Sequence, residues 1–282
     1  MTKKNIAIIG VGLIGGSLAL KCRSNSTVSH VIGVEANPAH AAKAVELGLV
    51  DECCSLEEAV RRSEVVVLAV PVGVITAILP KVLDLITNQI VIDMGSTKSA
   101  LVQAVQYHPK RGRYVASHPM WGTEYSGPEA AVENAFEEKA VILCDLADSD
   151  KDAIAYARSL FESLCMHIIE MSARDHDLHA AYVSHIAHIT SFALANTVLE
   201  KEKEDNAIFE MASAGFESTV RLAKSNPEMW TPILMQNKDN VLDVLNEHIT
   251  QLRKFKSCLE KENWEYLTEL MNKANHIKRI IQ

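Results

Sequence analysis

The feature that most constrains this chain is a glycine-rich hexapeptide near its N-terminus. Gly10-Val11-Gly12-Leu13-Ile14-Gly15 follows a short apolar run, Ile6 to Ile9, and opens a segment with helical character. In a strand–turn–helix unit such glycines allow a tight turn, close approach of the backbone to a pyrophosphate, and close helix–strand packing. The amides at the helix N-terminus then bind phosphate. The sequence therefore predicts a dinucleotide site, and the residues expected against the cofactor are Gly10, Gly12, Leu13, Ile14 and Gly15.

An acidic residue at the end of the second apolar run indicates which dinucleotide binds. Glu35 follows Val31 to Val34, about 20 residues past the third glycine, where a carboxylate accepts hydrogen bonds from the ribose 2′-hydroxyl. A carboxylate repels a 2′-phosphate, and Ala36 and Asn37 provide no Arg to hold one. The pattern favours NAD over NADP. Val70-Pro71 either begins a second cofactor-facing loop or simply ends a strand.

Apolar runs alternate with amphipathic segments through the first 171 residues. Such runs are typical of strands buried on both faces, and the alternation predicts a doubly wound parallel sheet with helices on both sides. The expected strands are Ile6 to Ile9, Val31 to Val34, Val65 to Val70, Ile90 to Ile92, Tyr114 to Ser117, Val141 to Cys144 and His167 to Met171. The expected helices between them include residues 15–23, 38–47, 56–62 and 72–86.

A change of pattern at Ser172 predicts a domain boundary. Ser172-Ala173-Arg174-Asp175 resembles a helix capping box, and the strand signal ends there. We expect a dinucleotide-binding domain over residues 1–171 and an all-helical substrate and dimerisation domain over residues 172–282. A helical block of this size has little core of its own, so its apolar stripes must bury against the first domain or against a second copy of the chain, and we expect a homodimer. Those stripes comprise Leu242, Leu245, Ile249 and Leu252, then Leu267, Leu270, Met271, Ala274 and Ile277.

Charge and cysteine content narrow the partners and the compartment. The formal net charge is −8, from 28 Lys and Arg against 36 Asp and Glu, and this would repel phosphate backbones and anionic lipid. We therefore expect neither nucleic acid nor membrane as a partner. The six cysteines show no CxxC spacing, which favours reduced thiols and a cytoplasmic protein.

Polar residues follow two later strands, at the edge where open sheets of this kind bind ligands. They form the segments Asp93 to Lys98 and Ser117 to Glu124. His118 precedes Pro119, which favours an extended backbone at the strand end. An imidazole there either accepts a hydroxyl proton near neutral pH or hydrogen-bonds a loop.

Taken together, these motifs resemble those of the prephenate/arogenate dehydrogenase family. They occur in the family's order over nearly the whole chain, although Trp121 replaces the small residue usual at its position. The matching segments are Gly10 to Gly16, Gly95 to Lys98, His118 to Met120 with Gly122 to Glu124, Ser184 to His188, and Arg221 ahead of Pro227 to Trp230.

The resemblance implies a reaction and a set of site residues. Members of this family oxidise a ring carbinol with loss of CO2, giving a tyrosine precursor or tyrosine. By resemblance His118 is the base, Ser96 contacts that His and the substrate hydroxyl, and Arg221 grips a substrate carboxylate. The remaining residues expected at the substrate are Thr123, Glu124, His185 and His188.

The helical period predicts that two neighbouring histidines lie outside the site. His185 and His188 share one helix face, whereas His176 and His179 point elsewhere by the same 3.6-residue period. No HExxH motif or cysteine cluster accompanies these histidines, so no metal site is predicted.

Three alternatives stay open at the level of sequence. The named residues do not distinguish prephenate from arogenate. A β-hydroxyacid or imine reductase shares the general organisation, but the hydroxyacid enzymes generally place a catalytic Lys where residues 175–199 contain none. An NAD-sensing binding module would need the same fold but neither a proton acceptor nor an anion clamp.

Overall fold

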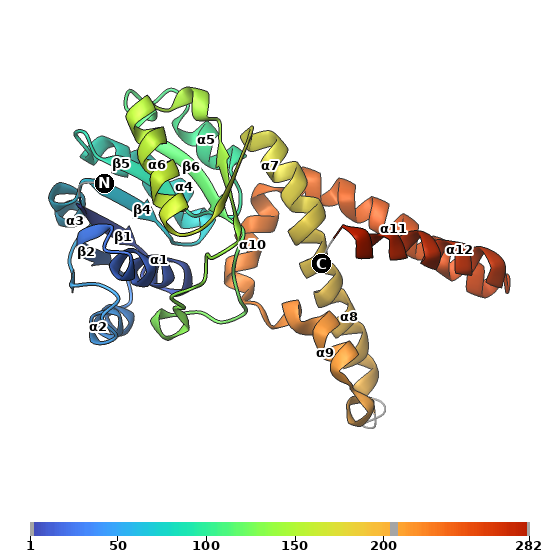
Figure 1. Cartoon of the computed structure of the whole chain (residues 1–282). Coiled ribbons are helices and arrows are strands. Elements are labelled where there is room, and N and C mark those ends of the chain that lie inside the picture. Colours follow the sequence, from blue (N-terminus) through green and yellow to red (C-terminus); the bar gives the residue numbers. More distant parts are fainter. Residues whose placement is uncertain (1–2, 204–207, 281–282) are drawn as a thin grey trace. The chain divides into compact units, whose positions relative to one another are not determined.

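The structure centres on one eight-stranded sheet (Figure 1). The computed structural model describes residues 3–203 and 208–280. The strand order is β3-β2-β1-β4-β5-β6-β7-β8, which places the switch in winding direction at β1. The strands are β1 (Lys4–Ile9), β2 (Val28–Val34), β3 (Glu52–Cys53), β4 (Val65–Leu68), β5 (Ile90–Asp93), β6 (Tyr114–Pro119), β7 (Ala140–Cys144) and β8 (His167–Met171).

The expected strands are all present, and one expectation about their direction is wrong. Strands β1 to β6 pair in parallel, but β7 runs antiparallel to β6, and β8 runs parallel to β7. The segment between β6 and β7 contains only a short 3-10 turn, η2 (Pro128–Ala130), in place of the helix that usually makes a parallel crossover. The short edge strand β3 was not among the predicted strands.

Helices cover both faces of the sheet, as predicted. Alternate residues of each central strand pack on opposite sides: Ile6 and Ile8 of β1 enter one buried cluster, and Ala7 and Ile9 enter the other. The first cluster includes residues of α1 (Leu13–Ser24), α2 (Pro38–Glu46) and α6 (Lys151–Ser163). The second includes residues of α3 (Leu56–Arg62), α4 (Val72–Leu85) and α5 (Ser99–Val105).

The chain after β8 is helical throughout the part that the structure describes. Ser172 caps the first of these helices by accepting a 3.0 Å hydrogen bond from the Asp175 amide, as the capping pattern predicts. Figure 1 shows α7 and α8 following each other in yellow. The elements are α7 (Ala173–Ala180), the π-helical turn η4 (Ala181–His185), α8 (Ile186–Glu202), α9 (Ala214–Val220), the 3-10 turn η6 (Arg221–Lys224) and α10 (Pro227–Gln236).

The chain forms two compact units, residues 1–237 and residues 238–282. The second unit consists of α11 (Lys238–Glu260) and α12 (Trp264–Ala274), which contact each other, and the 3-10 turn η7 (Asn275–Arg279). The boundary between a dinucleotide-binding domain and a helical domain at residues 171 and 172 stays a prediction. None of the described helices is long and apolar enough to cross a membrane.

Candidate active site

The glycine loop has the backbone that its sequence predicts. Gly10 lies at the end of β1 with φ +91°, a conformation that side chains disfavour, and a Cβ there would lie 2.7 Å from the Ala69 carbonyl oxygen. A Cβ on Gly15 would lie 2.0 Å from the carbonyl oxygen of Gly10. Both positions therefore require glycine. Val70 closes over the same turn, because its Cγ1 would lie 2.6 Å from a Cβ on Gly10, while Pro71 precedes the first residue of α4.

The loop presents uncrowded backbone at Gly12, where α1 begins, as a bound pyrophosphate requires. A Cβ on Gly12 would meet nothing closer than the Gly127 amide nitrogen at 3.9 Å. Gly12 is also the N-cap of α1, and no side chain caps that helix, which begins with Leu13 and Ile14. Free helix amides beside uncrowded backbone match the phosphate cradle of a dinucleotide site.

Glu35 lies beside the glycine loop. Its Oε2 accepts a 3.2 Å hydrogen bond from the Val11 amide, and its Oε1 accepts one of 3.2 Å from the Asn37 amide. These bonds hold the Glu35 carboxylate next to the turn of the first glycines, as the prediction of a ribose acceptor requires. The residues present therefore fit a dinucleotide.

Three side chains form a hydrogen-bonded line at the end of β6. His118 Nδ1 lies 2.8 Å from His176 Nε2, and His176 Nδ1 lies 2.8 Å from Asp177 Oδ1. His176 and Asp177 are each only 2% exposed, whereas His118 is half-buried. The buried end of the line is thus the carboxylate, and the imidazole of His118 is its more accessible end.

The position of His176 contradicts the helical-period prediction, which placed it outside the site. The nine positions between His176 and His185 correspond to two and a half turns of a regular helix, and so to opposite faces. The π-helical turn η4 lies between them and changes the phase of the helix. The adjacent pair His176-Asp177 was a signal in the sequence, because a carboxylate next to an imidazole often fixes its tautomer.

A buried ion pair links the carboxyl ends of β5 and β6. Lys98 Nζ binds Asp93 Oδ2 and donates a 2.6 Å hydrogen bond to the Ser117 carbonyl, and both charged side chains are fully buried. Asp93 also accepts from the Tyr114 hydroxyl at 2.7 Å and from the Ser117 amide at 3.1 Å. This network ties β5 to β6 at Ser117, the residue before His118. In the sequence, Asp93 and Lys98 were recognisable only as members of a polar segment, and nothing there indicated that they form a buried pair.

The surroundings of His118 keep its imidazole neutral. Burial lowers its pKa well below the ordinary value near 6.5, and the neighbouring His176, Lys98 and His185 lower it further. A neutral imidazole at neutral pH is the form that accepts a proton.

His185 and His188 meet at one aromatic side chain, Trp230 of α10. The His188 ring stacks on Trp230 with centroids 3.5 Å apart, and the His185 ring contacts it edge-on at 5.9 Å. Asn237 places its Nδ2 3.1 Å from His185 Nδ1 and also donates to the Asp177 carbonyl at 2.6 Å. His185 therefore lies next to the His118 line through Asn237, and His188 joins His185 at Trp230.

Arg221, the residue predicted to bind a substrate carboxylate, is paired with Glu124. Arg221, the first residue of η6, places Nη1 3.4 Å from Glu124 Oε2, and its side chain is 52% exposed. Burial lowers the pKa of His188, and the nearby positive charge of Arg221 lowers it further. Thr123, in the same loop as Glu124, accepts a 3.3 Å hydrogen bond from the Tyr125 amide.

Two residues differ from what the resemblance implied about their surroundings. No hydrogen bond joins Ser96 to His118 in the part of the chain that the structure describes, although both lie at the carboxyl ends of neighbouring strands. Trp121, the departure from the family pattern, is half-buried against the core and packs edge-on against Phe136 at 5.8 Å. Its bulk is accommodated there.

The buried His185 predicts a loss of stability in mild acid. Burial lowers its pKa to about 4, despite the opposing charge of Asp177, whereas an unfolded His titrates near 6.5. Below pH 6.5 the unfolded chain binds a proton that the folded chain does not, so stability falls until about pH 4. Between pH 7.5 and pH 5 this group alone is expected to remove about 2 kcal/mol of unfolding free energy.

Urea unfolding at these two pH values tests that expectation. His185→Gln should reduce the difference, and the exposed His179→Gln should leave it unchanged. An equal pH dependence in wild type and His185→Gln would contradict it.

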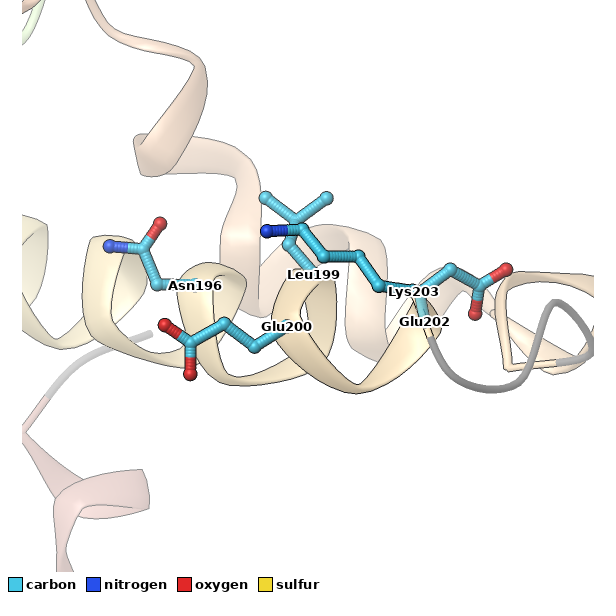
Figure 2. A pocket seen from close by; sticks show the side chains of 5 residues that line it. All are labelled: Asn196, Leu199, Glu200, Glu202 and Lys203. Carbon is cyan, nitrogen blue, oxygen red and sulfur yellow. The ribbon is translucent and has the colours of Figure 1, made fainter.

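A separate hollow lies on the C-terminal part of α8 (Figure 2). Figure 2 shows the side chains that line it, which come from the end of that helix and from the residue after it: Asn196, Leu199, Glu200, Glu202 and Lys203. None of the predicted site residues lines it. The hollow is therefore separate from the candidate active site.

Comparison with protein families matches both halves of the chain. Residues 18–170 match the family model described as prephenate dehydrogenase, nucleotide-binding domain. Residues 172–273 match the model described as prephenate dehydrogenase, dimerization domain. The first match begins after the glycine hexapeptide.

Individual relatives are similar over most of the chain. A prephenate dehydrogenase of Bacillus subtilis is 34% identical over 94% of this chain and 72% of its own length. A cyclohexadienyl dehydrogenase of Zymomonas mobilis is 32% identical over 94% of this chain and 92% of its own. The crystal structure of a prephenate dehydrogenase from A. aeolicus, in complex with hydroxyphenyl propionate and NAD+, matches with a TM-score of 0.91 at 30% identity, covering 100% of this chain and 99% of that one.

Proposed function

The chain belongs to the prephenate dehydrogenase family, and from that premise we propose that it catalyses the NAD-dependent oxidative decarboxylation of prephenate to 4-hydroxyphenylpyruvate in tyrosine biosynthesis. The observation that carries the proposal is His118. It is a neutral, half-buried imidazole at the carboxyl end of β6, at the same sheet edge as the glycine loop. A dehydrogenase needs a base there, and a sensor does not.

His118 and Ser96 would perform the proton chemistry. Bound NAD would accept the hydride from the ring carbinol carbon. His118 takes the hydroxyl proton through its Nε2, since its Nδ1 is occupied by His176. The bond to the ring carboxylate breaks, its electron pair makes the ring aromatic, and CO2 leaves. The proton on His118 then returns to the oxygen that becomes the phenol. We propose that Ser96 orients the substrate hydroxyl toward His118.

Arg221 would hold the substrate. Prephenate is dianionic, and the planar guanidinium fork suits bidentate pairing with a carboxylate. Its present contact with Glu124 is a weak, partly exposed pair of 3.4 Å, so a substrate carboxylate can replace it at little cost. Thr123, His185 and His188 complete the proposed substrate pocket, with the histidines kept neutral by burial.

The direct test is the absorbance of reduced nicotinamide with purified protein. Prephenate and arogenate are offered separately, each with NAD and with NADP. The proposal expects turnover of prephenate with NAD. Preference for arogenate would reassign the substrate. Arogenate is the second candidate because one relative is named cyclohexadienyl dehydrogenase. Absence of turnover in all four mixtures would contradict a dehydrogenase and favour an NAD sensor.

The choice of cofactor predicts the behaviour of a variant at Glu35. In Glu35→Gln the carboxylate that would accept from the ribose hydroxyls is neutral, so NAD affinity should fall about ten- to hundredfold. Affinity for NADP should rise relative to NAD, because the charge that repels its 2′-phosphate is gone. Titrations with NADH and NADPH, whose reduced nicotinamide ring fluoresces, measure both affinities. The exposed Glu57→Gln is the matched control, and an unchanged NAD-to-NADP ratio in Glu35→Gln would contradict the assignment.

We also propose a homodimer formed through the C-terminal helices. Apolar side chains predicted to lie at an interface are exposed in the single chain, namely Leu242, Leu252, Met271 and Ile277. Exposed apolar side chains in such number favour association. Sedimentation should give about twice the chain mass of 31.1 kDa. A monomer at micromolar concentration would contradict this proposal.

We propose that the enzyme works in the cytoplasm. The cysteines are all unpaired in the structure, which suits a reducing compartment. Cell fractionation followed by detection of the chain tests this, and recovery outside the cytoplasmic fraction would contradict it.

A further inference from the structure

The hydrogen bonds of the line His118–His176–Asp177 determine which ring nitrogens carry protons. The pKa of Asp177 is low overall, because hydrogen bonds from His176 and from the Lys98 and Ser99 amides outweigh the effect of burial. An ionised carboxylate only accepts hydrogen bonds, so His176 Nδ1 carries the proton that it donates to Asp177. In neutral His176 the other nitrogen, Nε2, is then an acceptor.

The same logic extends to His118. Its Nδ1 lies 2.8 Å from the accepting Nε2 of His176, so Nδ1 is the protonated nitrogen of His118. The Nε2 of His118 is left without a proton. This is the nitrogen that has to be free in a general base.

Asp177 is itself held in place by backbone. Its Oδ1 accepts from the Lys98 amide at 2.8 Å, and its Oδ2 accepts from the Ser99 amide at 2.9 Å. Those amides lie at the N-terminus of α5, in the segment that follows the end of β5 at Asp93. The carboxylate that starts the line is therefore anchored to the sheet edge of the site, and its 2% exposure keeps water from competing with His176.

We propose that His176 and Asp177 are positioning residues that hold His118 in the tautomer with a bare Nε2 and stabilise the imidazolium formed during the reaction. When His118 accepts the hydroxyl proton on Nε2, its Nδ1–H still donates to His176, and the positive charge faces the Asp177 carboxylate through that ring. No further proton acceptor is required, because the proton returns to the phenolic oxygen. The inference deepens the proposed function and rests on it.

The other charged and titratable groups around His118 make this support necessary. Lys98, from the segment after β5, and His185, from η4, both disfavour a positive charge on His118. Asp93 lies at the end of β5 but is bound to Lys98. Hydrogen bonds connect the Asp177 carboxylate to His118, and they run through the ring of His176.

The tautomer is measured directly by long-range ¹H–¹⁵N NMR of protein labelled in its histidines, with the His118 signals assigned from His118→Asn. The wild-type protein is expected to show His118 protonated at Nδ1 and bare at Nε2. In His176→Leu the acceptor is lost, so a proton on Nε2 of His118 should become populated. His176→Gln retains an oxygen that can accept from Nδ1 and should preserve the wild-type tautomer.

Kinetics give a second readout that a purely structural role would not produce. In His176→Leu, kcat should fall about 10²-fold, with KM for prephenate and Kd for NAD changed by less than about threefold. His176→Gln should recover part of kcat but not all, since an amide cannot share the charge. His179→Gln, exposed on the same helix, should match the wild type.

Two results would overturn the proposal: a wild-type His118 that carries its proton on Nε2, or a His176→Leu protein that turns over at the wild-type rate. If His176→Leu does not fold, wild type and His176→Gln still decide the matter. The NMR measurement needs no substrate, so it separates this inference from the proposed function. The expected tautomer in a protein that turns over no substrate would contradict the function alone.

Discussion

His118→Asn is expected to fold and to bind NAD as the wild type does, while its turnover of prephenate falls about 10²- to 10⁴-fold. The amide is close to imidazole in shape and can still donate to His176, but it cannot accept the hydroxyl proton. The loss should appear in kcat, with little change in KM, since the group acts on the reacting hydroxyl. Steady-state absorbance kinetics and NAD titration together measure the effect.

The pH dependence of the wild type gives an independent check on the same base. Because burial and the nearby His176, Lys98 and His185 lower the pKa of His118, the neutral form persists below pH 6.5. We therefore expect kcat/KM to fall in acid with a midpoint below pH 6.5, lower than an unperturbed His would give.

His179→Asn is the control for the His118→Asn substitution. Near-normal turnover in His118→Asn would remove this residue from the mechanism.

Lys98→Met is expected to destabilise the fold by about 3–5 kcal/mol, because it leaves the buried Asp93 carboxylate without its cation. Met is similar in length to Lys, so the loss comes from charge and hydrogen bonding and not from an empty space. Lys98 Nζ also donates to the Ser117 carbonyl at 2.6 Å, and that acceptor loses its partner as well. Urea unfolding followed by circular dichroism measures the change.

Two further variants separate the buried charge from other causes. Adding Asp93→Asn to Lys98→Met removes the unpaired charge, so the double variant should be more stable than the single one. Lys139→Met, at an exposed position, should change stability by no more than about 0.5 kcal/mol. A loss as small as that in Lys98→Met would show that Asp93 does not depend on the pair.

The parts of the site that sequence predicts well are those that depend on neighbours along the chain. Gly10 and Gly15 are required by the backbone of one turn, and their spacing is readable without knowledge of the fold. Glu35 comes directly after the next strand of the same unit, and its carboxylate accepts from the Val11 amide. Ser172 likewise caps a helix through a residue three positions away.

The parts that sequence misses depend on residues far apart in the chain. His176 lies 58 positions from His118, and a π-helical turn displaces the phase that a regular helix would give. Lys98 and Asp93 are close in sequence, but their significance comes from complete burial, which composition does not reveal. Strand β7 runs antiparallel to β6, yet it has the same kind of apolar run as the parallel strands β4 to β6. The apolar pattern depends on burial and not on strand direction.

Local geometry and residue chemistry thus sufficed to predict a dinucleotide-binding sheet and its cofactor, since a turn, a cap or a strand end is encoded in consecutive residues. They placed His118 at a strand end, and the family resemblance gave it the role of base that we propose. The support of that base was decided by the assembly of the fold. Which nitrogen of His118 is free depends on a hydrogen-bonded line that reaches from β6 to α7 and on to the start of α5. Such a line exists only after packing has excluded water and brought distant side chains within hydrogen-bond distance.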